Sequence, residues 1–239
     1  MNILAIGNSF SEDATRYLYG IARADGVKIN VFNLCIGGCS LDRHYRNMLS
    51  DARVYELQCN GHKTEFYVSL SEALTNREWD IITIQQVSHL GVFKESFKPY
   101  AHAFADFLRK YAPKAKIYLH QTWGYEDNSQ RLNHEMKYDS YKAMQSDLTR
   151  VYQEVAKEIG ADGIIRSGEM FEKLIDCGVT KVHRDTFHAS LGIGRYALAL
   201  LWYKTLIGGS VNDNVFSDFD EEIPATVAKK IRQTVDSFI

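Results

Sequence analysis

A serine and an aspartate–histidine pair are the residues whose types and spacing suggest acyl-transfer chemistry. Ser9 follows the short apolar run from Ile3 to Ile6, and Asp185 precedes His188 by three residues. Acyl transfer needs a nucleophile, a base that takes its proton, and donors aimed at the oxygen on which negative charge develops. In a turn that leads into a helix, this spacing lets the carboxylate reach the Nδ1 proton of the ring and leaves Nε2 facing the serine.

Two pairs of residues offer hydrogen-bond donors for such an oxygen. Gly37-Gly38 follows the second apolar segment of the chain, and Gln85-Gln86 ends the third. In a doubly wound sheet, ligands bind outside the carboxyl ends of the strands where the strand order reverses. If the first strand lies between the second and third, a hydroxyl, a backbone amide and a side-chain amide converge there. Each pair also has a structural alternative, since glycines permit positive φ and glutamines satisfy backbone groups at a sheet end.

Short β-rich runs alternate with longer segments of helical period, which predicts a mainly parallel sheet covered by helices on both faces. The expected strands are residues 3–6, 27–34, 80–86, 116–120 and 163–165. We expect a first helix capped by Ser11, and further helices over residues 100–110, 140–159 and 191–206. Residues 55–68 carry Asn60-Gly61 at their middle, which predicts a hairpin with a type I′ turn. We place this hairpin as a small excursion near the rim of a five-stranded sheet, in a single domain that spans residues 1–239.

Composition excludes several classes of protein. The chain has 239 residues, 45% of them hydrophobic and 24% charged, with a formal net charge of -2. No basic field is available to hold a phosphate backbone, so nucleic acid is not an expected partner. No apolar run approaches the roughly 18 to 20 residues of a membrane span, and no leader is recognised, so we expect a soluble protein and no membrane. Four cysteines are few and scattered; reduced thiols in a cytoplasm explain them, as does a secreted protein without its signal peptide.

The ordered blocks of the sequence resemble those of the SGNH, or GDSL-like, hydrolases. The resemblance spans Ser9 to His188: GNSFS after the first strand, a glycine pair after the second, an amide pair after the third, and DxxH before a late helix. The match is nearest to a bacterial branch that also has the QTW segment found here at 121–123. The resemblance implies a flavodoxin-like three-layer α/β/α fold and hydrolysis of esters, often of acetyl groups on carbohydrates. It implies Ser9 as nucleophile, His188 as base, Asp185 as its orienting partner, and the amides of Ser9 and Gly38 as oxyanion donors.

The sequence departs from that family in two blocks. The usual Gly-Asp-Ser is Gly7-Asn8-Ser9 here, and the usual Gly-x-Asn-Asp is replaced by a segment that begins at Gln85-Gln86. A glutamine amide can donate to an oxyanion as an asparagine does, with a longer reach. We therefore expect Gln85 or Gln86 to supply the third donor.

Further residues follow the strands and are candidates for substrate contact. Trp123 and Tyr125 could stack on a sugar ring, although buried packing explains aromatic residues equally well. Asn8 and His89 complete the candidate substrate-binding residues. His183, Asp185 and His188 form a His-x-Asp-x-x-His pattern that could bind a metal, but no second cluster of ligands accompanies it, so we expect no metal.

The sequence predicts a serine hydrolase that cleaves small-acyl or carbohydrate O-acyl esters through an acyl-serine intermediate, without a cofactor. The expected partner is a small-molecule or carbohydrate ester, and the sequence indicates no oligomeric state. Histidine side chains ordinarily titrate near pH 6.5, so a histidine base predicts activity that declines below about pH 6 to 7. Two alternatives stay open: an acyltransferase with the same three residues, and an inactive carbohydrate-binding or sensory module on this fold.

Overall fold

A seven-stranded sheet forms the centre of the computed structural model, which describes residues 1–239. The strand order is β4-β3-β2-β1-β5-β6-β7, so β1 lies between β2 and β5, as the sequence predicts. Five of the strands run parallel to one another and match the five that the sequence predicts. They are β1 (Asn2–Gly7), β2 (Asn30–Cys35), β5 (Ile81–Ile84), β6 (Lys116–Gln121) and β7 (Gly163–Arg166).

The predicted hairpin belongs to the sheet itself, so the expected count of five strands and the placement as an excursion are wrong. Strand β3 (Tyr55–Cys59) pairs antiparallel with β2, and β4 (His62–Val68) pairs antiparallel with β3. Both residues of the turn have positive φ, 50° at Asn60 and 83° at Gly61, as a type I′ turn requires. The Asn-Gly dipeptide predicts a hairpin but does not show which strand edge the hairpin will extend.

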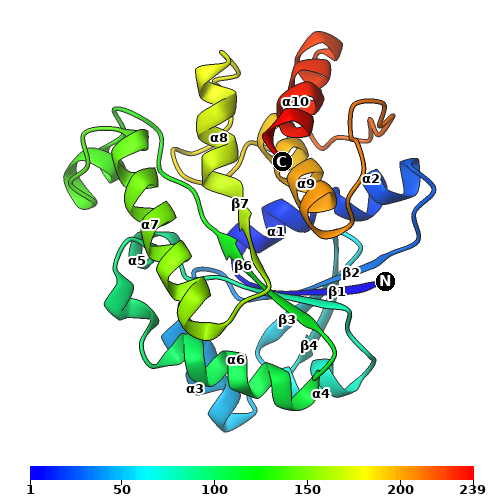
Figure 1. Ribbon diagram of the computed structural model, residues 1–239, viewed down its shortest axis with the longest axis vertical. Helices are drawn as coiled ribbons and strands as arrows, with labels where there is room; N and C mark the ends of the chain where they lie inside the picture. The colour runs from blue at the N-terminus through cyan, green and yellow to red at the C-terminus, as the bar shows by residue number, and fades with distance from the viewer.

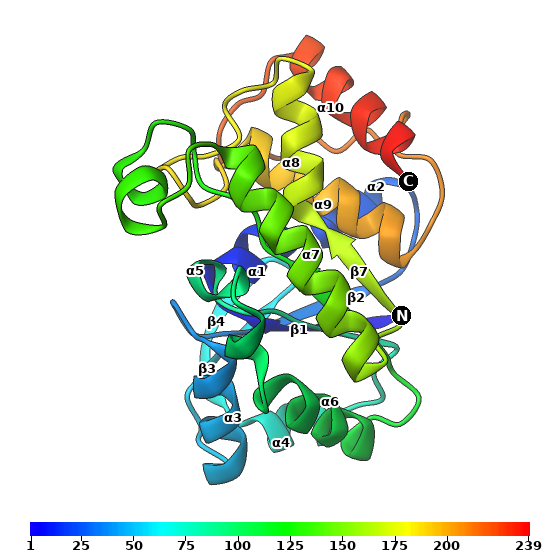
Figure 2. The same ribbon diagram turned by 60° about the vertical axis from the view of Figure 1, so that its left-hand side comes forward.

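Helices cover both faces of the sheet and give the three-layer α/β/α arrangement that the sequence predicts (Figures 1 and 2). One layer holds α1 (Ser9–Thr15), α2 (Leu18–Ala24), α9 (Ile193–Leu206) and α10 (Ala225–Phe238). The other layer holds α3 (Leu41–Ser50), α4 (Leu70–Thr75) and α6 (Tyr100–Tyr111). The long α7 (Tyr141–Ile159) packs beside α6 and against β6 and β7, and α8 (Ser167–Asp176) packs between α7 and α9. The short α5 (Ser88–Gly91), a 3-10 turn (Lys94–Phe97) and a π-helix (Arg131–Glu135) lie in the connections after β5 and β6.

Helix α9 is buried around most of its circumference because other helices surround it. It packs against α1, α2, α8 and α10, and ten of its fourteen residues are buried. A helix that is apolar all round is stable only inside a protein. Helices α8 and α10 were not predicted, and α10 is the element that encloses the outer side of α9 (Figure 1).

The first helix begins three residues earlier than predicted, because Asn8 caps it in place of Ser11. Asn8 has extended φ and ψ, and its Oδ1 accepts a hydrogen bond from the amide of Phe10 at 3.0 Å. Ser11 is buried inside the helix and donates instead to the carbonyl of Asn8 at 2.8 Å. Ser9 is therefore the first helical residue, where backbone N–H groups have no partner within the helix.

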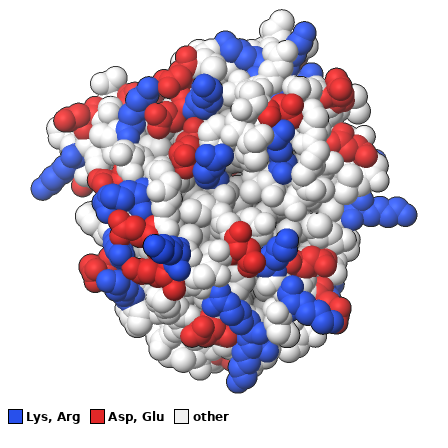
Figure 3. Space-filling view, viewed as in Figure 1, with Lys and Arg blue, Asp and Glu red and all other residues white.

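The face of the molecule in Figure 3 shows no broad field of one charge. Lysine and arginine side chains alternate with aspartate and glutamate across the face seen in Figure 3. None of the helices combines the length and the apolar character that crossing a membrane requires.

Candidate active site

The structure brings Ser9, His188 and Asp185 into one chain of hydrogen bonds. Ser9 Oγ lies 2.8 Å from His188 Nε2, and His188 Nδ1 lies 2.8 Å from Asp185 Oδ2. The second carboxylate oxygen of Asp185 accepts the backbone N–H of His188 at 2.9 Å. Because the carboxylate accepts a hydrogen bond from Nδ1–H, the ring is held in the tautomer whose Nε2 can accept the proton of the serine hydroxyl. Burial alone raises the pKa of Asp185, but the hydrogen bonds from His188 outweigh it and the pKa is lowered.

The turn that carries Asp185 and His188 is fixed by bonds to its own backbone. His183 and Ala189 form an antiparallel bridge, and the amide of Arg184 donates to the carbonyl of His188 at 3.0 Å. Trp123 Nε1 donates to the carbonyl of Phe187 at 2.7 Å. These contacts fix the backbone of the turn, and the hydrogen bond from Nδ1 to Asp185 orients the ring with Nε2 toward Ser9.

A buried aspartate, Asp13, joins this turn to the helix that carries Ser9. Its carboxylate accepts hydrogen bonds from Arg184 Nη1 at 2.9 Å, from Arg195 Nε at 2.8 Å and from the amide of Ala189 at 3.2 Å. The Asp13 side chain is 1% exposed, so water screens these pairs little. Sequence reasoning missed this role, because an acidic residue in the first turn of a helix is explained by the helix dipole alone. Asp13 thus holds the helix that carries Ser9 at a fixed distance from the turn that carries His188.

Two backbone amides at the pocket, those of Ser9 and Gly38, have no hydrogen-bond partner within the protein. Gly38 has a φ of 62°, which favours glycine, and a Cβ at this position would meet no other atom. The positive φ of the backbone, rather than lack of space for a side chain, therefore explains the glycine at this position.

Gln85 and Gln86 do not supply an oxyanion donor, and that expectation is corrected. Both side chains are buried and neither lines the pocket. Gln86 Nε2 donates to the carbonyl of Ser96 at 2.9 Å, and its Oε1 accepts the amides of Leu41 and Val87. Gln85 Nε2 donates to Asn8 Oδ1 at 2.8 Å. Both glutamines therefore have the structural role that the sequence left open, at the end of β5.

Gln85 belongs to a buried relay that sets the orientation of Asn8. His120 Nδ1 donates to Gln85 Oε1 at 2.9 Å, and Gln85 Nε2 donates to Asn8 Oδ1. Burial lowers the pKa of His120 to about 3, so its ring is neutral. Because Asn8 Oδ1 accepts two N–H groups, its amide cannot be flipped, and Nδ2 donates one hydrogen to the carbonyl of Cys39 at 3.0 Å. Asn8 lines the pocket, and the second hydrogen of its Nδ2 has no hydrogen-bond partner within the protein.

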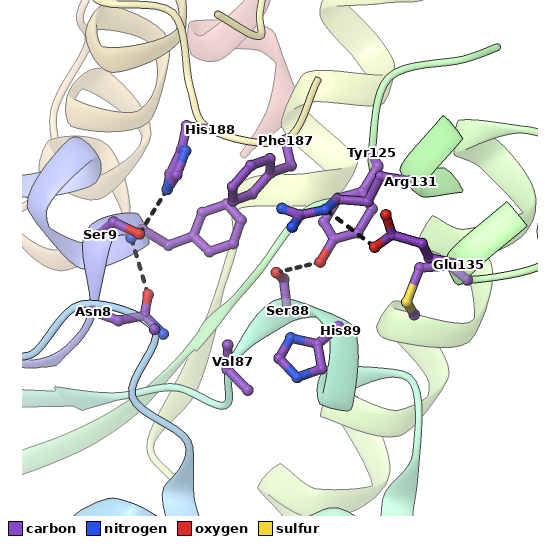
Figure 4. A pocket seen from close by; sticks show the side chains of 13 residues that line it. Asn8, Ser9, Val87, Ser88, His89, Tyr125, Arg131, Glu135, Phe187 and His188 are labelled. Atoms are coloured by element: carbon purple, nitrogen blue, oxygen red, sulfur yellow. Dashed lines mark hydrogen bonds and ion pairs between the residues drawn. The ribbon is translucent and has the colours of Figure 1, made fainter. Parts of the chain in front are cut away.

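The pocket in front of Ser9 has a volume of about 590 Å³ and is lined by both apolar and polar side chains (Figure 4). Of the predicted substrate-binding residues, Asn8, His89 and Tyr125 line it. Trp123 does not, because its side chain is buried behind Phe10, whose ring it meets edge-on with centroids 4.0 Å apart. The pocket is lined by Asn8, Ser9, Phe10, Gly38, Val87, Ser88, His89, Tyr125, Arg131, Glu135, Met136, Phe187 and His188.

Arg131 and Glu135 are pocket residues that sequence reasoning missed. They lie on the π-helix in the connection between β6 and α7. A π-helix has no simple sequence signature, and a charged pair four residues apart is typical of any exposed helix face. Only their position near the pocket, which the fold sets, distinguishes them.

His183 and His188, two residues of the possible metal-binding pattern, bond to different groups in the fold. His183 Nε2 donates to the carbonyl of Gly124 at 3.1 Å, while His188 faces Ser9 and Asp185. No group of three or more histidine, cysteine, aspartate or glutamate side chains is arranged to hold a metal ion. All four cysteines are free thiols.

Comparisons with known proteins identify the fold and the family. Residues 2–235 match the family model described as Domain of unknown function (DUF4886). No curated protein matches the chain. The crystal structure of a DUF4886 family protein from Bacteroides uniformis shares 30% sequence identity with a TM-score of 0.91, and the match covers 99% of this chain and 93% of that one.

More distant structures share the fold. A proposed SGNH hydrolase from Slackia heliotrinireducens is 20% identical with a TM-score of 0.62, over 86% of this chain and 98% of that one. An acetyl xylan esterase from Geobacillus stearothermophilus is 17% identical with a TM-score of 0.52, over 85% and 93%. The likeness to SGNH hydrolases seen in the sequence is thus confirmed at the level of the fold. The chain belongs to the DUF4886 family and has the α/β/α fold of the SGNH, or GDSL-like, hydrolases.

Proposed function

We propose that this protein is a serine esterase that hydrolyses small-molecule or carbohydrate esters through an acyl-serine intermediate. The observation that carries the proposal is the contact of 2.8 Å between Ser9 Oγ and His188 Nε2, with Asp185 on the far side of the ring. A nucleophile, a base and a group that orients the base are the parts that acyl transfer requires. The fold shared with an acetyl xylan esterase supports an ester as substrate.

In the first half of the reaction, Ser9 Oγ attacks the ester carbonyl while His188 Nε2 takes the hydroxyl proton. The carbonyl oxygen becomes an oxyanion, and when the tetrahedral intermediate collapses, the C–O bond to the alcohol breaks. His188 returns its proton to the leaving alcohol oxygen. In the second half, water gives a proton to His188 and attacks the acyl-serine; the free acid leaves and Ser9 regains its proton from His188.

Three N–H groups are proposed to hold the oxyanion. The amides of Ser9 and Gly38 are free of partners within the protein, and both residues line the pocket. We assign the third donor to the second hydrogen of Asn8 Nδ2, in place of the glutamines. Donors fixed before the reaction stabilise the developing charge without having to reorganise, and in many enzymes this stabilisation contributes more to the rate than any other effect.

The nucleophile is tested with a fluorophosphonate probe and peptide mapping. We expect the probe to label Ser9 and the label to disappear in His188→Ala. Ser88→Ala is the matched control, because Ser88 also lines the pocket, but its hydroxyl bonds Tyr125 Oη at 2.8 Å and makes no hydrogen bond to a histidine. Labelling at Ser88, or no labelling of folded protein, would argue against the esterase and for a binding module.

A further inference from the structure

The guanidinium of Arg131 lies in the pocket with its terminal nitrogens unpaired. Its centre is 3.9 Å from the centroid of the Phe187 ring and 5.8 Å from that of Tyr125. Arg131 Nε lies 3.5 Å from Glu135 Oε2, and no hydrogen bond within the protein uses Nη1 or Nη2. Figure 4 shows the guanidinium pointing toward Phe187 and the side of the pocket where Ser9 and His188 lie, with Glu135 behind it.

The segment that carries Arg131 is held against the turn of the proposed catalytic residues. The amide of Glu126 donates to the carbonyl of Thr186 at 2.7 Å, next to Phe187. Leu132 is fully buried, and its amide donates to Ser129 Oγ at 3.1 Å. The side chain of Arg131 is 37% exposed, less than the 57% of Glu135. Arg131 is therefore anchored at its backbone and covered on one face by an aromatic ring.

The charge of the pocket leaves this guanidinium incompletely balanced. Glu135 is the only carboxylate that lines the pocket, and its contact is long and reaches only Nε. His89 does not add a charge near neutral pH, because burial and the neighbouring Arg131 lower its pKa. Nη1 and Nη2 form a fork that matches two oxygens of a carboxylate. A group with two negative charges suits the site less well, because it would face Glu135 with a single cation between them.

We propose that Arg131 binds a carboxylate of the substrate, so that the preferred substrates are esters that carry a carboxylate group. This proposal rests on the proposed esterase function. The carboxylate belongs either to the acyl part, as in a dicarboxylic hemiester, or to the alcohol part, as in an acylated sugar acid. In both cases the guanidinium fixes the substrate within the same cavity as Ser9. Stacking on Phe187 shields one face of the guanidinium from water, which strengthens its pairing with an anion.

The test compares charged with neutral esters in the wild type and in Arg131→Gln. One arm uses 4-nitrophenyl hemiglutarate against 4-nitrophenyl valerate, and the other uses acetylated methyl glucuronide against acetylated methyl glucoside. We expect the wild type to prefer the charged ester in at least one arm, which identifies the part that carries the carboxylate. Arg131→Gln should lower the charged-to-neutral ratio of kcat/KM in that arm at least tenfold, mainly through KM, and 0.5 M salt should weaken the preference.

Arg150→Gln is the matched control. Arg150 also pairs with a glutamate four residues on, Glu154, but it lies on α7 outside the pocket, so its loss should leave the ratio unchanged. Glu135→Gln removes the competing carboxylate and should raise the ratio. An equal ratio in the wild type and Arg131→Gln, in both arms, overturns the inference.

A binding measurement separates failure of this inference from failure of the esterase. Glutarate and methyl glucuronide are titrated calorimetrically against the wild type and Arg131→Gln. If the wild type hydrolyses no ester and Ser9 is not labelled, the esterase fails; binding of either anion that is lost in Arg131→Gln still supports the site. Absence of binding to the wild type, together with no charge preference in hydrolysis, refutes it.

Discussion

At the scale of single residues, the substitution of asparagine for aspartate before the serine changes what the side chain can do. Both residue types cap a helix by accepting a backbone N–H, as Asn8 does from Phe10. An asparagine also donates, and here the donor end faces the backbone at Cys39, next to Gly38. His120 and Gln85 hold it that way through two hydrogen bonds of 2.9 and 2.8 Å.

Asn8→Asp should therefore retain the cap and lose the oxyanion donor. We expect kcat to fall about a hundredfold, as when one such donor is removed from other hydrolases. The lost bond to the carbonyl of Cys39 should cost about 1 kcal/mol of stability. Ester hydrolysis and urea unfolding measure the two effects separately. A kcat equal to that of the wild type would show that Asn8 does not donate a hydrogen bond to the oxyanion.

The sequence predicted that Ser9, Asp185 and His188 come together, because each lies where a strand or turn meets a helix and local patterns mark such places. It misassigned Gln85 and Gln86 because the partners of a buried amide come from elsewhere in the chain. His120 lies on β6 and Ser96 lies in the 3-10 turn, and nothing in the local sequence of the glutamines shows that these groups will reach them.

At the scale of elements, the site depends on how α1 is joined to the turn that precedes α9. Asp13 makes this connection with Arg184 of the turn and Arg195 of α9. Sequence patterns predicted the first helix and α9 but not their docking, because an ion pair between distant residues leaves no local signal. The same limit explains the hairpin: its turn was predicted correctly, but not its attachment to β2.

Asp13→Asn tests whether that ion pair positions the histidine. Removing one partner of a buried pair typically costs about 3 to 5 kcal/mol, because the remaining charge is left unpaired. We expect that loss in urea unfolding, and a kcat that falls more than KM rises, because the ring of His188 loses its fixed distance to Ser9. Asp220→Asn is the control: Asp220 pairs with the same Arg195 but is 25% exposed and does not contact the turn, so both effects should be smaller. Equal effects of the two substitutions would make Asp13 a general structural residue.

At the scale of the whole molecule, three histidines are buried in neutral form and couple folding to pH. Burial lowers the pKa of His44 and His120 to about 3 and that of His183 to about 4. Nε2 of both His44 and His120 has no hydrogen-bond partner, so a proton there would be buried without compensation. In the unfolded chain each histidine takes up a proton near pH 6.5.

The folded protein should therefore lose stability as pH falls from about 6.5 toward 4. In that window the unfolded state binds more protons than the folded state, so the free energy of unfolding decreases with decreasing pH. Each histidine contributes up to about 1.4 kcal/mol per pH unit, and the three together approach roughly 4 kcal/mol per unit. The free energy of unfolding of a typical protein is only about 5 to 15 kcal/mol.

Urea unfolding followed by tryptophan fluorescence at pH 7.5, 6.5, 5.5 and 4.5 measures how the free energy of unfolding changes with pH. His44→Gln should reduce this slope by the contribution of about one proton. A free energy of unfolding that is constant from pH 6.5 to 4.5 would instead show that these rings accept protons without unfolding of the protein.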